Sequence, residues 1–141
     1  MTTTPAVMKG ETIQVAAPSG TMFVIVMEVD GRPAQIEVLI GKAGTQVAAW
    51  AQASTVLINA LLERGESLDF IMESLRDITS DRVARGLTRT MRSDVEAVYY
   101  ALNAYRNGQK RVDTYLDIED ITGPERNVSV APWARVRGRQ S

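Results

Sequence analysis

The chain has 141 residues, of which 45% are hydrophobic and 23% are charged, and its formal net charge is −1. This length and composition predict one globular domain with enough apolar side chains to build a core. The absence of cysteine and histidine excludes disulfides, thiolate nucleophiles, imidazole bases and most zinc or haem ligation.

The remaining residue types leave little material for catalysis. Only carboxylate, lysine or tyrosine chemistry, or magnesium held by oxygen ligands, remains for a catalyst. We therefore expect a protein that is not an enzyme and that has no cofactor and no bound metal. The sequence contains no apolar run of about 18 residues and no secretory signal, so we expect a cytoplasmic protein without a membrane span. The near-neutral charge makes nucleic acid an unexpected partner.

Three strands are predicted in the first third of the chain. Residues 12–16 alternate between apolar and polar, and residues 21–29 are rich in β-branched and apolar side chains, which indicates a strand buried on both faces. Asp30 and Gly31 predict a two-residue hairpin turn, and residues 32–40 form the returning strand. We therefore expect a three-stranded antiparallel meander.

Helices are predicted from Thr45 onward, where the apolar period changes from two to about 3.6 residues. The first helix runs to Arg64, with Gly65 just beyond its end, and it is apolar over much of its circumference. Ser67 is the predicted cap of a second helix. We expect these two helices to form a hairpin over one face of the sheet, with the first helix also packed on a neighbour.

A third helix is predicted to begin at a capping box from Ser93 to Glu96 and to end near Gly108. Some of its polar and aromatic residues lie largely off the apolar stripe, where they could reach solvent or a ligand. These residues are Tyr100, Asn103 and Arg106.

The ends of the chain predict extended segments around this domain. Residues 1–11 are small and polar and indicate a flexible leader, so the domain is expected at residues 12–108. Residues 109–141 predict an extended basic tail. The stretch after Pro124 contains four arginines and one glutamate, which gives it a net charge of +3. Trp133 in that tail favours docking on a neighbouring subunit, since an indole in a free arm has little structural reason to be there.

Four arginines precede the third helix at spacings of three, four and three residues: Arg82, Arg85, Arg89 and Arg92. This spacing would align them on one face of a helix, although Gly86 disfavours a helix there. Two interpretations stay open. The arginines form either a solvated cationic surface or a row that faces a ligand.

The stretch Gly41-Lys42-Ala43-Gly44-Thr45 joins the last strand to the first helix. It fits neither the phosphate-binding P-loop nor the Gly-x-Gly-x-x-Gly spacing. Lys42, the Gly44 amide and the Thr45 hydroxyl could hold a phosphate. Alternatively, the glycines allow a sharp turn and Thr45 caps the helix. In the same way, Trp50 and Tyr99 are interpreted as core residues rather than as stacking platforms.

The Asp-Gly hairpin, the piece Gly31-Arg32-Pro33 and the piece Gly41-Lys42-Ala43-Gly44 before a helix together resemble the TSCPD domain. That domain occurs near the C-terminus of adenosylcobalamin-dependent ribonucleotide reductases and in free-standing small proteins. The resemblance covers roughly residues 21–102. With the predicted elements, it indicates an α+β fold, in which a small three-stranded antiparallel sheet is packed by a helical hairpin and a third helix.

The sequence departs from this family at its namesake motif. Residues 90–94 read Thr-Met-Arg-Ser-Asp, which keeps only the first and last residues of Thr-Ser-Cys-Pro-Asp. Arg92 stands where the family has a cysteine, and Ser80 replaces another. We therefore expect neither the metal binding nor the redox exchange that the family's cysteines perform. We also expect no ribonucleotide reduction by this chain itself, because the large barrel that carries reductase catalysis is not part of this sequence.

We expect non-catalytic binding of a phosphorylated, nucleotide-like ligand, because guanidinium groups suit phosphates and aromatic faces suit bases. The plan is similar to that of phage sponge proteins that sequester cyclic-nucleotide or cyclic ADP-ribose immune signals. Alternatives are an accessory or regulatory partner of a ribonucleotide reductase and a purely structural protein. Exposed sheet edges and the apolar first helix predict a homo-oligomer. The candidate ligand-binding residues are Lys42, Gly44, Thr45, Arg82, Arg85, Arg89, Arg92, Tyr100, Asn103, Arg106 and Trp133.

Overall fold

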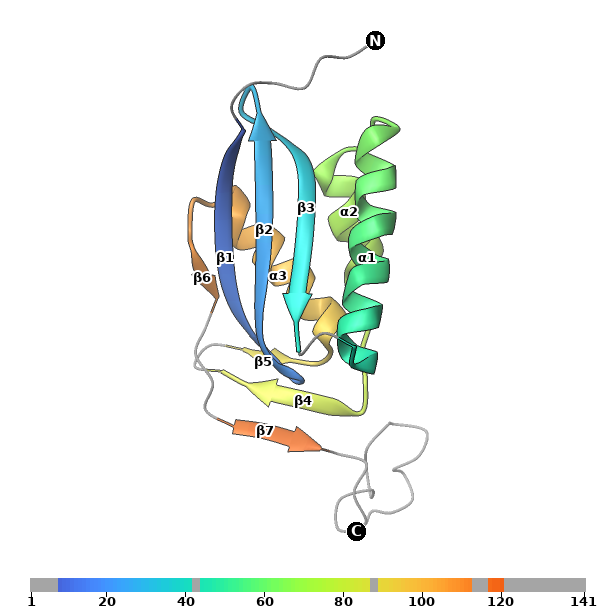
Figure 1. Ribbon diagram of the computed structural model, residues 1–141. Helices are drawn as coiled ribbons and strands as arrows, with labels where there is room; N and C mark the ends of the chain where they lie inside the picture. Colours follow the sequence, from blue (N-terminus) through green and yellow to red (C-terminus); the bar gives the residue numbers. More distant parts are fainter. Residues whose placement is uncertain (1–7, 42–43, 87–88, 113–116, 121–141) are drawn as a thin grey trace.

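The computed structural model of the protein describes residues 8–41, 44–86, 89–112 and 117–120. A four-stranded sheet in the order β3-β2-β1-β6 forms its centre. The helix α3 crosses behind this sheet, α1 runs beside β3, and a small sheet in the order β5-β4-β7 lies at one end (Figure 1). This architecture confirms the predicted α+β class and the three antiparallel strands.

The first three strands form the predicted meander. They are β1 (Lys9–Ala17), β2 (Gly20–Val29) and β3 (Arg32–Ile40), paired antiparallel. The turn between β2 and β3 needs positive φ at both of its residues, and it has φ of 54° at Asp30 and 76° at Gly31. The hairpin is therefore at the position that the Asp-Gly signal predicts.

The chain at both ends of the predicted domain joins this sheet. β1 begins at Lys9, within the predicted leader. The short strand β6 (Arg111–Val112) pairs parallel to β1, within the predicted tail, and the Gln14 amide donates to the Lys110 carbonyl at 3.0 Å. The segment that follows α3 thus extends the sheet beside the first strand.

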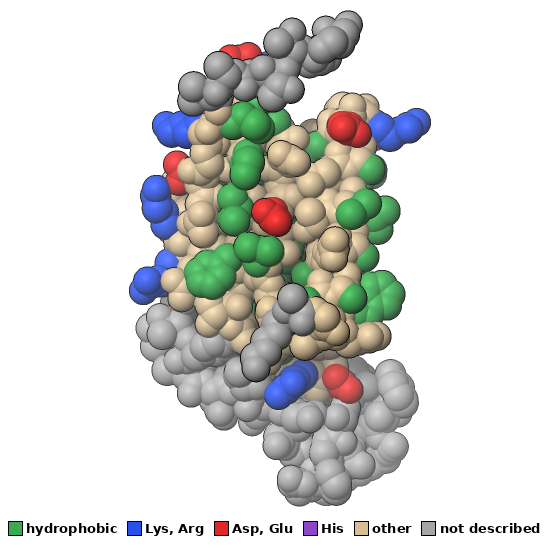
Figure 2. Space-filling view, in the orientation of Figure 1, with side chains coloured by type: hydrophobic (Ala, Val, Ile, Leu, Met, Phe, Trp, Pro, Cys, Tyr) green, Lys and Arg blue, Asp and Glu red, His purple; other side chains and the backbone are tan. Residues whose placement is uncertain are grey.

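Only one face of the sheet forms the core. Alternate residues of the three long strands are buried beneath the helices: Ile13, Val15, Met22, Val24, Val26, Ile36, Val38 and Ile40. The opposite face carries Phe23, 40% exposed, and Leu39, 44% exposed, and Figure 2 shows hydrophobic side chains gathered along it. The prediction that β2 is buried on both faces is wrong, because α3 packs on the core face and α1 takes a different position.

The helix α1 (Gln46–Glu63) lies along the edge of the sheet beside β3 (Figure 1). Asn59 supplies both hydrogen bonds that a neighbouring strand would make with Ile36. Its Oδ1 accepts from the Ile36 amide at 2.7 Å and its Nδ2 donates to the Ile36 carbonyl at 2.9 Å. Thr55 Oγ1 accepts from the Val38 amide at 2.9 Å. Side chains of a helix therefore satisfy the strand edge, and the predicted helical hairpin over one sheet face is wrong for α1.

The other two helices differ in length and role. α2 (Leu68–Leu75) has Ser67 as its cap, whose side chain accepts from the Phe70 amide at 3.0 Å. α3 (Asp94–Arg106) packs on β1 and β2. Its inward residues include Ala97, Ala101 and Ala104, each at most 2% exposed. These small side chains let the helix approach the sheet closely.

The described residues of the segment with the four arginines include two strands and no helix. The strands are β4 (Arg82–Arg85) and β5 (Thr90–Met91), and β4 also pairs with β7 (Asp117–Asp120). The prediction that the arginines align on one face of a helix is therefore wrong, because the backbone hydrogen bonds of β4 and β5 go to neighbouring strands.

No helix in the described ranges is long and apolar enough to cross a membrane.

Replacing Asn59 by alanine leaves the Ile36 amide and carbonyl without these partners. We expect this substitution to lower the free energy of unfolding by about 1–3 kcal/mol, measured by urea denaturation. Gln52→Ala, on the exposed side of the same helix, is the matched control and should change it by less than about 0.5 kcal/mol. Equal stability of the two variants would contradict the assigned role of Asn59.

Candidate functional site

A buried carboxylate lies at the start of α3. Glu96 is 2% exposed, and it accepts hydrogen bonds from the Arg92 amide at 2.8 Å and from Arg92 Nε at 2.8 Å. Arg92 Nη2 also contacts Glu96 and pairs with Asp77 Oδ1 at 3.1 Å. The hydrogen bond to Glu96 raises the pKa of the Arg92 guanidinium above its ordinary value. Arg92 was predicted to bind a phosphate of the ligand. In the structure its guanidinium pairs with the buried carboxylate of Glu96.

The residues around Arg92 are also held by internal hydrogen bonds. Ser93 Oγ accepts from the Glu96 amide at 2.9 Å and donates to the Ile78 carbonyl. This is one half of the predicted capping box. The other half is wrong, because Glu96 accepts from the Arg92 amide instead of the Ser93 amide. Asp94 accepts from the Ser19 amide at 3.0 Å and from the Ser19 hydroxyl, and so ties the start of α3 to the β1–β2 turn.

The two positions that replace family cysteines are neighbours in space. The Ser80 amide donates to the Arg92 carbonyl at 2.7 Å, and Ser80 Oγ donates to the same carbonyl at 3.1 Å. The fold thus brings these two positions together. They carry a hydroxyl and a guanidinium here, so thiol chemistry is absent from this place.

A second group of arginines surrounds two tyrosines on α3. The Tyr99 and Tyr100 rings pack edge to face with centroids 5.1 Å apart. Arg89 lies over the Tyr100 ring, with its Cζ 4.3 Å from the centroid, and Arg76 lies over the Tyr99 ring at 5.9 Å. We call these four residues the arginine–tyrosine surface. Both arginines are in the range of cation–π attraction.

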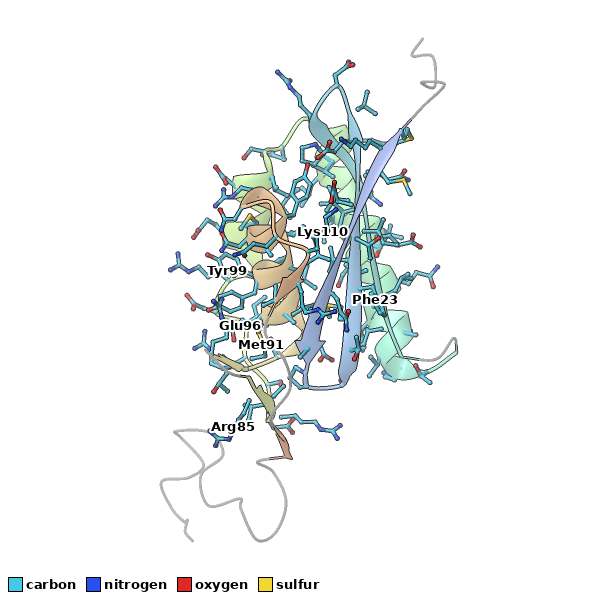
Figure 3. The ribbon with its side chains drawn as sticks, turned by 90° about the vertical axis from the view of Figure 1, so that its left-hand side faces the viewer. Phe23, Arg85, Met91, Glu96, Tyr99 and Lys110 are labelled. Carbon is cyan, nitrogen blue, oxygen red and sulfur yellow. The ribbon has the colours of Figure 1, made fainter. Side chains whose placement is uncertain are left out.

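The arginine–tyrosine surface faces away from the sheet. Tyr99 and Phe23 lie on opposite sides of the molecule in Figure 3, with α3 and the sheet between them. Tyr99 and Tyr100 are half-buried and pack against the core, so the interpretation of Tyr99 as a core residue is partly right. The backbone places Asn103 on the same side of α3, one turn beyond both tyrosines.

Arg76 is a site residue that the sequence reasoning missed. It lies just after α2 and pairs with Glu73 at 3.3 Å, with about half of its side chain exposed. The charge of Glu73 raises the pKa of Arg76. A basic residue at the end of α2 was the available signal, but nothing in the sequence indicated that α2 and α3 are neighbours.

The other predicted ligand residues are dispersed. Arg82 and Arg85 lie on β4, and Arg85 is near the lower end of the molecule in Figure 3. Thr45 caps α1, because its Oγ1 accepts from the Ala48 amide at 3.2 Å, and the exposed Gly44 precedes it. Lys42 and Trp133 lie outside the described residues.

Arg106 lines a separate cavity of about 600 Å³ beyond the C-terminal end of α3. It pairs with Asp69, while Lys110 Nζ pairs with Glu11 Oε1 at 2.9 Å, and the Tyr105 hydroxyl donates to Glu28. Burial raises the pKa of Tyr105, and the hydrogen bond from Lys110 lowers the pKa of Glu11. Arg106 and Lys110, the cations among the described residues that line this cavity, thus each face a carboxylate.

Trp50 is 68% exposed on α1, and its interpretation as a core residue is wrong. The helix lies at the sheet edge, so its outer side does not meet the core.

The described residues contain no group of three or more side chains that could hold a metal ion.

The sequence profile of the TSCPD domain matches residues 1–106 of the 141 residues. The chain belongs to the TSCPD domain family. This confirms the resemblance, and it relates the chain to domains associated with ribonucleotide reductases. No curated protein and no solved structure gave a match.

Arg92→Ala leaves the buried Glu96 carboxylate without its cation. We expect a loss of about 2–4 kcal/mol in the free energy of unfolding, measured by urea denaturation at pH 7. Arg82→Ala, an exposed arginine on the neighbouring strand, is the control and should cost less than about 0.5 kcal/mol. The double variant Arg92→Ala/Glu96→Gln should recover part of the loss. If Arg92→Ala is as stable as the control, the pairing with Glu96 does not stabilise the fold.

Proposed function

We propose that this TSCPD-family chain is a non-catalytic binding protein for a phosphorylated, nucleotide-like ligand, and that the ligand contacts the arginine–tyrosine surface. The observation that carries the proposal is the stacking of Arg89 on Tyr100 at 4.3 Å, beside the Tyr99–Tyr100 ring pair. Guanidinium groups offer paired N–H donors to phosphate oxygens, and aromatic rings offer a face to a nucleobase.

The side-chain contacts reduce the number of predicted residues that we propose as ligand contacts. Arg92 is engaged by a buried carboxylate, and Arg106 is paired with Asp69 at the other end of α3. Arg76 and Arg89 lie over tyrosine rings at the exposed side of the molecule, and Arg76 also pairs with the exposed Glu73. The proposed contacts are therefore Arg76, Arg89, Tyr99, Tyr100 and Asn103.

Sequestration of a signal nucleotide is the form of binding that we propose. Without cysteine or histidine, the chain lacks the side chains most often used as nucleophile or general base. A bound nucleotide would therefore be held and later released unchanged. This is the behaviour of the phage sponge proteins to which the chain is similar in plan.

An accessory role beside a ribonucleotide reductase is the alternative, and family membership favours it. In that case the chain should co-purify with a reductase from cells that express both. A sponge should instead co-purify with a small molecule, which mass spectrometry identifies after heat release.

Direct binding separates these proposals. We expect isothermal titration with ATP, ADP-ribose and a cyclic dinucleotide to show binding of at least one of them. Arg89→Ala and Tyr100→Ala should each weaken that binding about tenfold, because a base–aromatic stack contributes about 1–3 kcal/mol and a tenfold change in affinity corresponds to about 1.4 kcal/mol. Arg32→Ala, an exposed arginine at the β2–β3 turn, should leave it unchanged. No binding by any probe, or equal losses in all three variants, would refute the proposed surface.

A further inference from the structure

α1 combines exposure with an absence of charge. Of its 18 residues only Glu63, the last, is charged. Yet in α1, all of which the structure describes, Ile58 alone is fully buried. Trp50, Val56 and Leu57 are 68%, 59% and 65% exposed. A helix on a protein surface ordinarily carries charged residues on its outer side, so this outer side has the composition of a contact surface.

We infer that α1 packs antiparallel against α1 of a second copy of this chain, across a two-fold axis near the middle of the helix. We call this contact surface the α1 seam, formed by Ala49, Trp50, Ala53, Val56, Leu57 and Ala60. It is independent of the arginine–tyrosine surface proposed above, which is formed by Tyr99 and Tyr100 of α3 with Arg76 and Arg89.

The pattern of large and small residues fits such a pairing. In an antiparallel pair centred between Ala53 and Val56, Ala53 meets Val56 of the second copy and Ala49 meets Ala60, while Trp50 lies one residue from the level of Ala60. Large side chains thus oppose small ones, which lets two helices approach closely and interdigitate. A two-fold contact uses the same surface on both copies, and an uncharged surface meets itself without like-charge repulsion.

The charges at the helix ends favour the antiparallel direction. The N-terminal end of a helix carries partial positive charge and attracts carboxylates, but the first turn of α1 contains no acidic residue. Antiparallel pairing places Glu63 of one copy near the N-terminal end of α1 in the other. Each helix then supplies the charge that the other lacks, whereas parallel pairing would bring the two Glu63 side chains together.

The edge of β3 offers no competing route to a dimer at this side of the sheet. The hydrogen bonds from β3 to Asn59 and Thr55 occupy the positions that a strand of a second copy would need. The α1 surface outside this edge is about 27 Å long and 10 Å wide. Since a stable complex buries about 800 Å² per partner, two helices of this size give a weak dimer that depends on concentration.

Sedimentation velocity of the full chain over a range of concentrations tests the inference. We expect the dimer fraction to rise with concentration, and Leu57→Glu to weaken association at least tenfold. Phe70→Glu on α2 and Phe23→Glu on the open sheet face replace other exposed hydrophobic residues and should leave association unchanged. The proposed α1 seam is wrong if the chain is a monomer at every concentration. It is also wrong if the Phe23→Glu variant dissociates while the Leu57→Glu variant remains a dimer.

Crosslinking gives a second test that does not depend on a disruptive charge. The chain has no cysteine, so Ala53→Cys introduces a single thiol near the proposed axis. A short bismaleimide crosslinker should join two Ala53→Cys chains into a covalent dimer. Ser74→Cys, exposed on α2, should stay monomeric under the same conditions. Equal crosslinking of both variants would overturn the assignment to α1.

Discussion

The burial of the Glu96 carboxylate is the constraint on which much of the structure depends. A charge at 2% exposure needs a partner, and Arg92 supplies it from the end of β5 while also reaching Asp77 beyond α2. One guanidinium thereby joins the end of β5, the first turn of α3 and the segment that follows α2. The degenerate Thr-Met-Arg-Ser-Asp motif is best understood as this structural junction.

The helices are distributed around the sheet according to their side chains. α3 covers the core face because alanines at its inward positions permit close approach. α1 occupies the edge because Thr55 and Asn59 offer the polar atoms that a strand edge needs. The outer face of the sheet is left with exposed apolar residues, Phe23 among them. A three-layer arrangement would have needed an additional helix over that face.

The strands and their turn could be predicted from sequence because their signals are local. Alternation places Ile36, Val38 and Ile40 on one face, and Asp30-Gly31 fits only a tight hairpin. The position of α1 could not be predicted in this way. Helical periodicity shows that a buried stripe exists, but it does not say whether a face or an edge of the sheet receives it.

The site was harder to predict than the fold because it depends on contacts between distant segments. The arginine spacing predicted a helix. That helix does not form, because β4 pairs as a strand with β7, some 35 residues further along the chain. Arg76 meets Tyr99 only because α2 packs beside α3. Burial of Glu96 likewise has no local signal, since the same residue could cap a helix from the surface.

The pairing of β6 with β1 has a consequence for how the chain folds. β1 is the first strand in the sequence, yet the residues that pair with its outer edge at Gln14 and Val15 are Arg111 and Val112, near the end of the domain. Loop closure over nearly a hundred residues must precede this pairing, and such non-local contacts form slowly. During synthesis the meander and α1 emerge first with an incomplete sheet edge. The domain therefore reaches its final hydrogen bonding only when almost all of it has left the ribosome.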